Sequence, residues 1–149
     1  MSSILGIDPD VEKNGIAFAQ GDKFSLHNLS FFDTLEMIDI DYLDLVIIEG
    51  GWLNKGNWHR VKNGSSNINA KIGSYVGANH AVGKLLVEYC VRNKINHEVI
   101  RPVKHKLKHN EFNLFVECNR SNQEIRDAAM LIVRNRLYNM KYKKGYKVN

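Results

Sequence analysis

The chain has 149 residues, of which 44% are hydrophobic and 25% charged; this composition excludes a disordered polymer, and we expect a single domain over residues 1–149. No stretch of about 18 apolar residues occurs and the N-terminus lacks a secretory pattern, which argues against a membrane or secreted protein and favours the cytoplasm. The net charge of +5 is uneven, because residues 1–54 hold two basic and ten acidic side chains (−8) and the remainder holds 19 basic and six acidic ones (+13). This asymmetry predicts a polyanionic partner for the basic part and a separate use for the clustered carboxylates.

The first third of the chain is predicted to consist mainly of strands. Apolar runs and alternating residues, separated by turn residues, indicate an antiparallel meander of three strands, then a short acidic helix and a strand suited to the centre of a sheet. The expected strands span residues 4–8, 15–20, 23–32 and 43–48, and the helix spans 34–38. Asp8 ends the first of these strands, and Glu49 follows the fourth.

The rest of the chain is predicted to be mainly helical. Residues 50–69 are rich in Gly, Asn and Ser and predict a long functional loop. Apolar residues at three- and four-residue steps then predict the longest helix at 69–93 and a final helix from about Ser121. The other expected elements are a strand at 97–100, a helix within 104–119 and a basic, flexible tail at about 141–149.

Four carboxylates stand at strand ends and at the start of the last helix: Asp8, Glu49, Glu124 and Asp127. A buried, ionised carboxylate is unfavourable unless it is paired, protonated or bound to a cation. Carboxylate oxygens are hard ligands that suit Mg²⁺ or Mn²⁺, so the sequence indicates a metal site. For Glu124 a second interpretation is equally open, because Ser121 and Glu124 have the spacing of a helix-capping box.

Several short motifs follow one another along the chain. They are Gly-Ile-Asp-Pro at 6–9 followed by Gly15, Ile-Ile-Glu at 47–49, Lys-Ile-Gly at 71–73 followed by Gly77, and Glu-x-x-Asp-Ala-Ala at 124–129. Their order, over nearly the whole chain, resembles the RuvC family of Holliday-junction resolvases in the ribonuclease H-like superfamily. The length of 149 residues is typical of the phage and viral members of that family, for which the expected location is the cytoplasm of the host cell. The resemblance implies an α/β, ribonuclease H-like fold with a mixed five-stranded sheet, strands 1–3 forming the antiparallel meander, flanked by helices.

The same resemblance implies an activity. The chain would be a metal-dependent endonuclease that resolves Holliday junctions and other branched DNA by symmetric phosphodiester hydrolysis, and it would act as a homodimer joined largely through the long helix. The implied catalytic residues are Asp8, Glu49, Glu124, Asp127 and Lys106. The four carboxylates would hold Mg²⁺ or Mn²⁺, two ions per active site, as in two-metal nucleases.

Aromatic and basic residues are expected to contact the DNA. Trp52 matches the position of an aromatic wedge in the family and Trp58 is a second candidate, with the alternative that a tryptophan in this loop packs back on the domain. Lys106 is a better match to the family's basic active-site residue than Lys108 is. The expected DNA-binding residues are Trp52, Trp58, Lys55, Arg60, Lys62, Lys71, Lys104 and Lys108.

One departure and two other functions stay open. Asp10 stands where the family usually has glycine, which puts the form of the first turn in question. The chain could be a junction- or nucleic-acid-binding module without chemistry, or a ribonuclease H-like nuclease that acts on RNA or on RNA–DNA hybrid. Clustered carboxylates argue against the module, because they repel DNA unless a metal ion intervenes. Cys90 and Cys118 lack a CxxC spacing and are expected to be free thiols.

Overall fold

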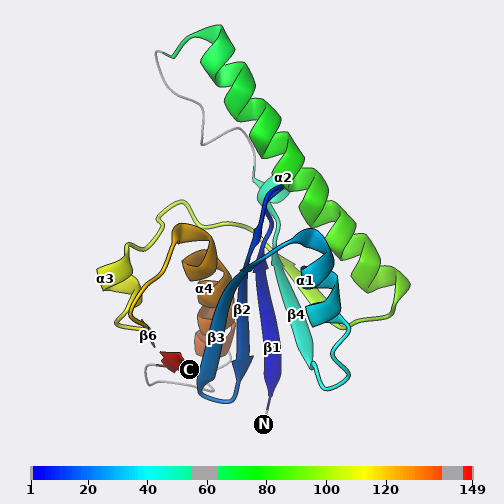
Figure 1. The fold of residues 1–149 in the computed structure, drawn as a ribbon, viewed down its shortest axis with the longest axis vertical. Helices are drawn as coiled ribbons and strands as arrows, with labels where there is room; N and C mark the ends of the chain where they lie inside the picture. The colour runs from blue at the N-terminus through cyan, green and yellow to red at the C-terminus, as the bar shows by residue number, and fades with distance from the viewer. Residues whose placement is uncertain (1, 55–63, 139–145, 149) are drawn as a thin grey trace.

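A computed structural model describes residues 2–54, 64–138 and 146–148, and its centre is a mixed sheet (Figure 1). The five principal strands are β1 (Ser3–Asp8), β2 (Asn14–Gln20), β3 (Lys23–Leu29), β4 (Leu45–Glu49) and β5 (His97–Ile100). β1, β2 and β3 pair antiparallel, β4 pairs parallel with β1, and β5 pairs parallel with β4. The spatial order is therefore β5-β4-β1-β2-β3, which confirms the predicted mixed five-stranded sheet and its meander.

Helices cover both faces of this sheet. They are α1 (Phe31–Ile38), the single 3-10 turn η1 (Gly51–Leu53), α2 (Ser66–Arg92), the short α3 (His109–Phe112) and α4 (Gln123–Tyr138). Figure 1 shows that α2 is the longest helix and that its first half extends well beyond the edge of the sheet. Among the described residues, no helix combines the length and the apolar character needed to cross a membrane.

The sheet separates two hydrophobic clusters. Side chains of a strand point alternately to its two faces. Ile4 of β1 therefore packs with α4, whereas Leu5 packs with buried residues of α1 and α2. One layer of helix thus lies on each side of the strands, and α4 crosses β1 and β2.

The first helix begins earlier than expected. The sequence predicts a strand to residue 32 and a helix from residue 34, but β3 ends at Leu29 and α1 begins at Phe31. Ser30 is the N-cap, because its hydroxyl oxygen accepts a hydrogen bond from the Asp33 N–H at 3.2 Å. Two adjacent phenylalanines fit the apolar pattern of a strand as well as that of a helix, so the cap rather than the pattern fixes this boundary.

The prediction of one helix within 104–119 is wrong apart from the single turn of α3. Phe112 and Val116 are both buried, and their four-residue spacing imitates a helix. The chain turns instead at Asn113, whose side-chain oxygen accepts a hydrogen bond from the Cys118 N–H at 2.7 Å. Asparagine side chains compete with helix formation in this way. Cys118 is a free thiol, as is Cys90, and both were expected to be free.

Two short strands extend the sheet beyond β3. They are β6 (Val116–Glu117) and β7 (Tyr146–Val148), in the order β3-β7-β6, and both pairings of β7 are parallel. β7 lies in the segment expected to be a flexible tail. Its backbone pairs with Lys23 and Phe24, so these three residues are part of the sheet instead.

Two glycines set how closely α4 approaches the sheet. A Cβ atom on Gly6 would lie 2.3 Å from the carbonyl oxygen of Ala128, and one on Gly15 would lie 2.2 Å from the carbonyl oxygen of Glu124. Any side chain at either position would push α4 away from β1 and β2. The first turns of α4, which carry Glu124 and Asp127, are therefore held directly against the strand backbones.

Candidate functional site

Asp8 and Glu49 are brought together by the register of two neighbouring strands. β1 and β4 run parallel, with Ile7 paired with Ile48. The next residue in each strand is the carboxylate, so both acids lie at the carboxyl ends of adjacent strands. Because side chains alternate along a strand, Glu49 lies on the same face as Ile47, which is the face that α4 covers.

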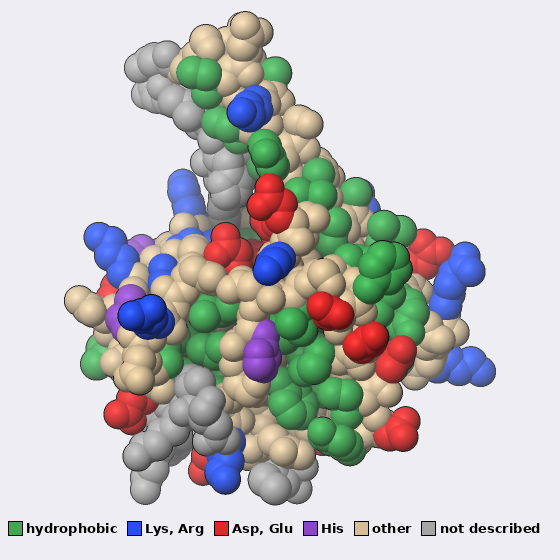
Figure 2. Space-filling model, viewed as in Figure 1, with side chains coloured by type: hydrophobic (Ala, Val, Ile, Leu, Met, Phe, Trp, Pro, Cys, Tyr) green, Lys and Arg blue, Asp and Glu red, His purple; other side chains and the backbone are tan. Residues whose placement is uncertain are grey.

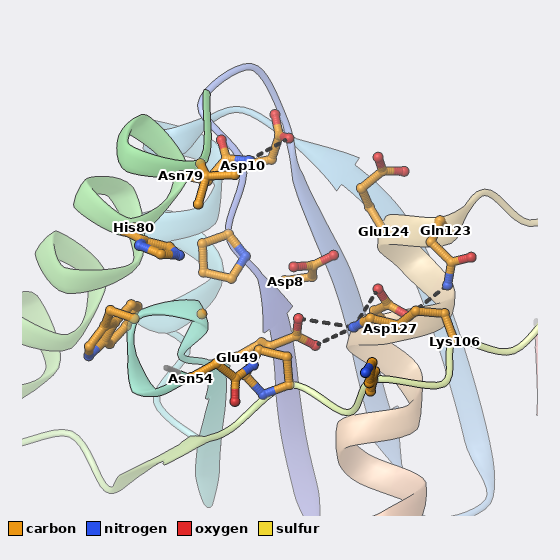
Figure 3. A pocket seen from close by; sticks show the side chains of 16 residues that line it. Asp8, Asp10, Glu49, Asn54, Asn79, His80, Lys106, Gln123, Glu124 and Asp127 are labelled. Carbon is orange, nitrogen blue, oxygen red and sulfur yellow. Dashed lines mark hydrogen bonds and ion pairs between the residues drawn. The ribbon is translucent and has the colours of Figure 1, made fainter. Parts of the chain in front are cut away.

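Asp127 reaches the same place from α4. Its carboxylate oxygen and those of Asp8 and Glu49 all lie within 4.8 Å of one another. Glu49 and Asp127 are only 7% and 8% exposed. Figure 3 shows the three side chains converging from β1, β4 and α4. Three carboxylates from separate parts of the sequence thus form one compact, largely buried cluster, which we call the carboxylate cluster.

Lys106 is the cation that contacts this cluster. Its Nζ atom lies 3.2 Å from Glu49 Oε1 and 3.1 Å from Asp127 Oδ2 (Figure 3). The lysine is itself partly buried, with 29% of its side chain exposed. Lys108, the other candidate, is exposed at the start of α3, where its backbone N–H donates to Glu111 Oε1 at 3.1 Å. Of the two lysines, the structure brings only Lys106 to the carboxylates.

Burial makes this cluster electrostatically unfavourable without a further cation. Burial raises the pKa of Asp8 well above its ordinary value, and repulsion from Glu49 and Asp127 raises it further. Burial also raises the pKa of Glu49, although attraction to Lys106 opposes the change. For Lys106 itself burial lowers the pKa, but attraction to the two carboxylates outweighs it, so the net shift is upward and the lysine stays charged. Attraction to Arg134 also opposes the rise in the pKa of Glu49, yet the net shifts of both Asp8 and Glu49 are upward, so these cations do not offset the three carboxylates.

The donor set fits a divalent metal ion of the Mg²⁺ or Mn²⁺ type. All three groups offer carboxylate oxygens, which are the hard ligands these ions prefer. The raised pKa values of Asp8 and Glu49 show that the cluster favours binding a cation, whether a proton or a metal ion. Residues of the sequence-predicted metal set are thus found together, with Glu124 in a different position from the other three.

Glu124 is not part of the three-residue cluster, but it lines the same cavity. It is not a helix cap, so the capping-box interpretation is wrong. The cap is Asn122, whose Oδ1 accepts a hydrogen bond from the Ile125 N–H at 3.0 Å. Ser121 instead bonds through its hydroxyl to His109 Nδ1 at 2.6 Å. The Glu124 carboxylate makes no hydrogen bond with the described part of the chain and is available to a ligand in the cavity.

Some polar residues of this cavity are not indicated by sequence pattern. The cavity has a volume of about 530 Å³ and includes the four acids and Lys106 in its walls, as well as Asp10 and Lys104. The polar lining residues that were not expected from the sequence are Asn54, Asn79, His80 and Gln123. Gln123 had a usable signal, because it stands four residues before Asp127 on a helix, where side chains meet. Its Nε2 donates to Asp127 Oδ1 at 2.7 Å.

Asp10 closes the turn after β1 with its own side chain. Its Oδ1 accepts from the Glu12 N–H at 2.8 Å, and its own N–H donates to Asn14 Oδ1 at 2.9 Å. Asn79 of α2 joins this turn, since its Oδ1 accepts from the Val11 N–H at 2.8 Å and its Nδ2 lies 3.4 Å from Asp10 Oδ2. Asp10 therefore orders the first turn, whose form was in question, and links it to α2.

Trp52 packs on the domain at the wall of the cavity. Its ring meets the ring of His80 edge to face, with the centroids 6.3 Å apart. It also lies close to the backbone of Gly83 in α2, where a Cβ atom would come within 2.5 Å of the indole. The structure thus supports the packing interpretation for Trp52, which is partly buried.

The other predicted DNA-binding residues divide into two groups. Lys71, Lys104 and Lys108 are exposed, and Lys104 lines the cavity. Lys55, Trp58, Arg60 and Lys62 lie outside the described residues.

The comparisons with known proteins concern the fold. By sequence, no family model and no curated protein matches the chain. By structure, it is similar to RuvC from Thermus thermophilus in complex with a Holliday junction substrate, with a TM-score of 0.56 and 12% identity over 95% of this chain and 96% of that chain. It is also similar to a second T. thermophilus RuvC structure, with a TM-score of 0.53 and 15% identity over 93% and 95% of the two chains. The chain therefore has the RuvC-like form of the ribonuclease H fold.

Proposed function

We propose that this protein is a divalent-metal-dependent, structure-selective endodeoxyribonuclease that resolves Holliday junctions and other branched DNA. The observation that carries the proposal is the convergence of Asp8, Glu49 and Asp127 within 4.8 Å, with Lys106 bonded to two of them. A protein that only binds DNA has no physical reason to gather three largely buried carboxylates where a polyanion must lie. The RuvC-like fold supports the same conclusion.

The four acids would hold Mg²⁺ or Mn²⁺, with Asp8, Glu49 and Asp127 as the central ligands and Glu124 at the side of the cavity. When bound, two such ions supply activation of the attacking water and stabilisation of the leaving oxygen in an in-line displacement. Lys106 contributes a fixed positive charge, because its pKa is raised. Gln123 orients Asp127 through its hydrogen bond. Lys104, exposed at the cavity wall, adds charge that attracts the DNA backbone.

A homodimer built on α2 would match the proposed substrate. Four hydrophobic side chains of α2 are between 51% and 60% exposed, and Figure 2 shows hydrophobic surface along this helix; they are Ile68, Tyr75, Leu85 and Val91. Ile68 and Tyr75 are seven residues apart and line one groove together with Ile72 and Val76. Grouped, exposed hydrophobic residues of this kind are typical of a surface that binds another protein. Two copies related by a two-fold axis would present two active sites to the two symmetric strands of a four-way junction.

The test is a comparison of substrates. Labelled four-way, three-way, linear duplex and RNA–DNA hybrid molecules are incubated with the protein in Mg²⁺, Mn²⁺ or EDTA. We expect paired cuts in the four-way junction that require metal. Metal-independent binding without products would favour the binding module instead, and cleavage confined to the hybrid would favour a ribonuclease H-like enzyme.

Asp8→Asn provides the matched variant. It removes one central ligand while keeping the shape of the side chain, so cleavage should fall by at least about 10³-fold while junction binding remains. Asp41→Asn, at an exposed position away from the cavity, is the control and should cut as the wild type does. An Asp8→Asn variant that still cuts would overturn the assignment.

A further inference from the structure

We propose that Arg126 is a positioning residue that aligns Asp127 and Lys106 with each other. This inference rests on the proposed function, since it concerns the geometry of the same site. Arg126 lies on α4 next to Asp127 in sequence, and it does not line the cavity itself. Its effect is transmitted through two neighbours, Gln123 and Leu107.

The first neighbour, Gln123, fixes the orientation of the Asp127 carboxylate. Gln123 Nε2 donates to Asp127 Oδ1 at 2.7 Å, while Lys106 Nζ lies 3.1 Å from Oδ2 of the same group. Each of the two carboxylate oxygens of Asp127 therefore has its own partner. A carboxylate held at both oxygens has a defined plane, which is what a metal ligand needs in order to offer one lone pair in a fixed direction.

Arg126 determines which way the Gln123 amide faces. Arg126 Nη2 donates to Gln123 Oε1 at 3.1 Å. A guanidinium has only donors, so it must face the amide oxygen, and the amide NH₂ is then left to face Asp127. Without Arg126 the amide could turn over and present its oxygen to the carboxylate, which would repel it.

The second neighbour, Leu107, ties Arg126 to the segment that carries Lys106. Arg126 Nε donates to the carbonyl oxygen of Leu107 at 3.0 Å. Residues 101–108 form no helix or strand, so Lys106 lacks the support of a regular element. The remaining donor, Nη1, reaches the carbonyl and hydroxyl oxygens of Ser121 at 2.9 and 3.0 Å.

All of these acceptors are neutral oxygens, one on the segment 101–108 and three on Ser121 and Gln123 at the start of α4. In the part of the chain that the structure describes, Arg126 forms no ion pair. Arg126 therefore contributes through the several hydrogen-bond donors of its planar guanidinium group, and not by neutralising the charge of one acidic residue. A lysine would keep the charge but could not make four hydrogen bonds in fixed directions. This makes Arg126→Lys an informative substitution.

The test measures Mn²⁺ binding by calorimetry and by electron paramagnetic resonance, in addition to cleavage of four-way junctions. The variants are Gln123→Met, which keeps the length of the side chain and removes its hydrogen bonds, and Arg126→Lys. Each should raise the dissociation constant for Mn²⁺ by about 10–100-fold, as outer-sphere partners of metal ligands commonly do. The double variant should bind Mn²⁺ no more weakly than Arg126→Lys alone, because both act through one hydrogen-bond chain. Arg120→Lys, at an exposed position, should leave Mn²⁺ binding unchanged.

Arg126→Lys should in addition lower kcat more than Gln123→Met does, because only this change frees Leu107 and hence Lys106. Melting temperatures identify variants that bind Mn²⁺ more weakly only because they are unfolded. If Arg126→Lys does not fold, the test uses Gln123→Met, which removes only two hydrogen bonds of a partly exposed side chain. Unchanged Mn²⁺ affinity in a folded Gln123→Met or Arg126→Lys variant would overturn the inference. A wild type that binds Mn²⁺ but cuts no substrate would overturn the proposed function alone, and one that binds no Mn²⁺ would overturn both.

Discussion

Two helices of this molecule are anchored very differently. α2 has 27 residues, but only Gly83, Leu86 and Cys90 are buried. α4 has 16 residues, and between positions 125 and 133 every side chain except that of Arg126 is buried. The shorter helix carries Glu124 and Asp127, whereas the longer one carries four of the ten large hydrophobic side chains that are exposed in the described part of the chain.

This difference separates two tasks. A metal ligand, the role proposed for Asp127, must be held within a fraction of an ångström, and α4 could meet that need because it rests on the backbones of β1 and β2 at Gly6 and Gly15. The proposed dimer interface must be accessible, and α2 could meet that need because its first half leaves the sheet (Figure 1). Substitutions should therefore act on stability through α4 and on association through α2.

The sharpest test of this contrast between α4 and α2 adds one methyl group at a glycine that faces α4 and one at a glycine within α2. Gly15→Ala should destabilise the protein by about 3 kcal/mol, because its Cβ would lie 2.2 Å from the carbonyl oxygen of Glu124. Gly77→Ala in α2 meets nothing within 4 Å and should instead stabilise the protein by roughly 0.5–1 kcal/mol, the usual gain for this change inside a helix. Urea unfolding measures both. A loss below about 1 kcal/mol for Gly15→Ala would show that α4 can shift, and the contrast would fail.

A second pair removes side chains. Ile132→Ala in α4 should cost about 2–5 kcal/mol, because Ile132 is fully buried. Tyr75→Ala in α2 should change the stability of the monomer by less than about 0.5 kcal/mol, since this ring is 51% exposed. Tyr75→Ala should nevertheless weaken self-association in sedimentation equilibrium. A large stability loss at low protein concentration would mean that the first half of α2 is anchored after all.

The carboxylate cluster predicts an unusual dependence of stability on pH. The pKa of Asp8 is raised above its ordinary value of 3.8, so the folded protein holds this proton more tightly than the unfolded chain does. Without metal, the resulting stabilisation is complete below that value and is lost as the pH rises through the raised pKa. Asp8→Asn should therefore exceed the wild type in stability near pH 8 in EDTA, and the difference should vanish near pH 3.

Thermal melts across this pH range check the sign. Mg²⁺ should raise the melting temperature of the wild type near pH 8 and have much less effect on Asp8→Asn. Equal responses to Mg²⁺ in both proteins would contradict the role given to Asp8.

The smallest expected effect lies where α2 ends. The Ile95 N–H bonds to the Cys90 carbonyl at 2.9 Å and the Lys94 N–H to the Val91 carbonyl at 3.2 Å, so Lys94 occupies the position in this motif that favours glycine. Its φ angle is 54°. Lys94→Gly should stabilise the protein by about 0.5–1 kcal/mol, whereas Lys84→Gly within the same helix should cost about 1 kcal/mol. Urea unfolding of the two variants should give shifts of opposite sign.

Much of the fold could be predicted from local patterns. β1, β2, β4 and β5 are short apolar runs bounded by turn residues, and the hydrophobic periodicity of α2 and α4 is clear, so each appears in the sequence. The structure of segment 104–119 could not be predicted in this way. The side-chain hydrogen bond of Asn113 determines where the chain turns, and apolar periodicity does not indicate such a bond. β7 pairs with strands far away in the sequence, which local patterns do not encode.

The part of the candidate site that depends only on where a residue stands relative to a strand could be predicted from the sequence. Asp8 and Glu49 follow apolar strands, so a parallel sheet brings them together once the register is known. The choice between metal ligand and helix cap for Glu124 could not be made from the sequence, since it depends on whether Ser121 or Asn122 caps the helix. The roles of Gln123 and Arg126 are visible only when the directions of their hydrogen bonds are known.

The poorly anchored first half of α2 also implies a gradient in the opening of its backbone. No residue of α2 before Gly83 is buried, so the amides of this part are protected mainly by the helix's own hydrogen bonds, and helices owe most of their stability to tertiary packing. Amide hydrogens around Leu86 and Cys90 open only when the core does. In a single copy of the chain, hydrogen exchange should therefore be fast near Ile68 and slow near Cys90. A partner that covers the first half would remove this gradient, which makes the exchange profile of one helix a direct readout of assembly.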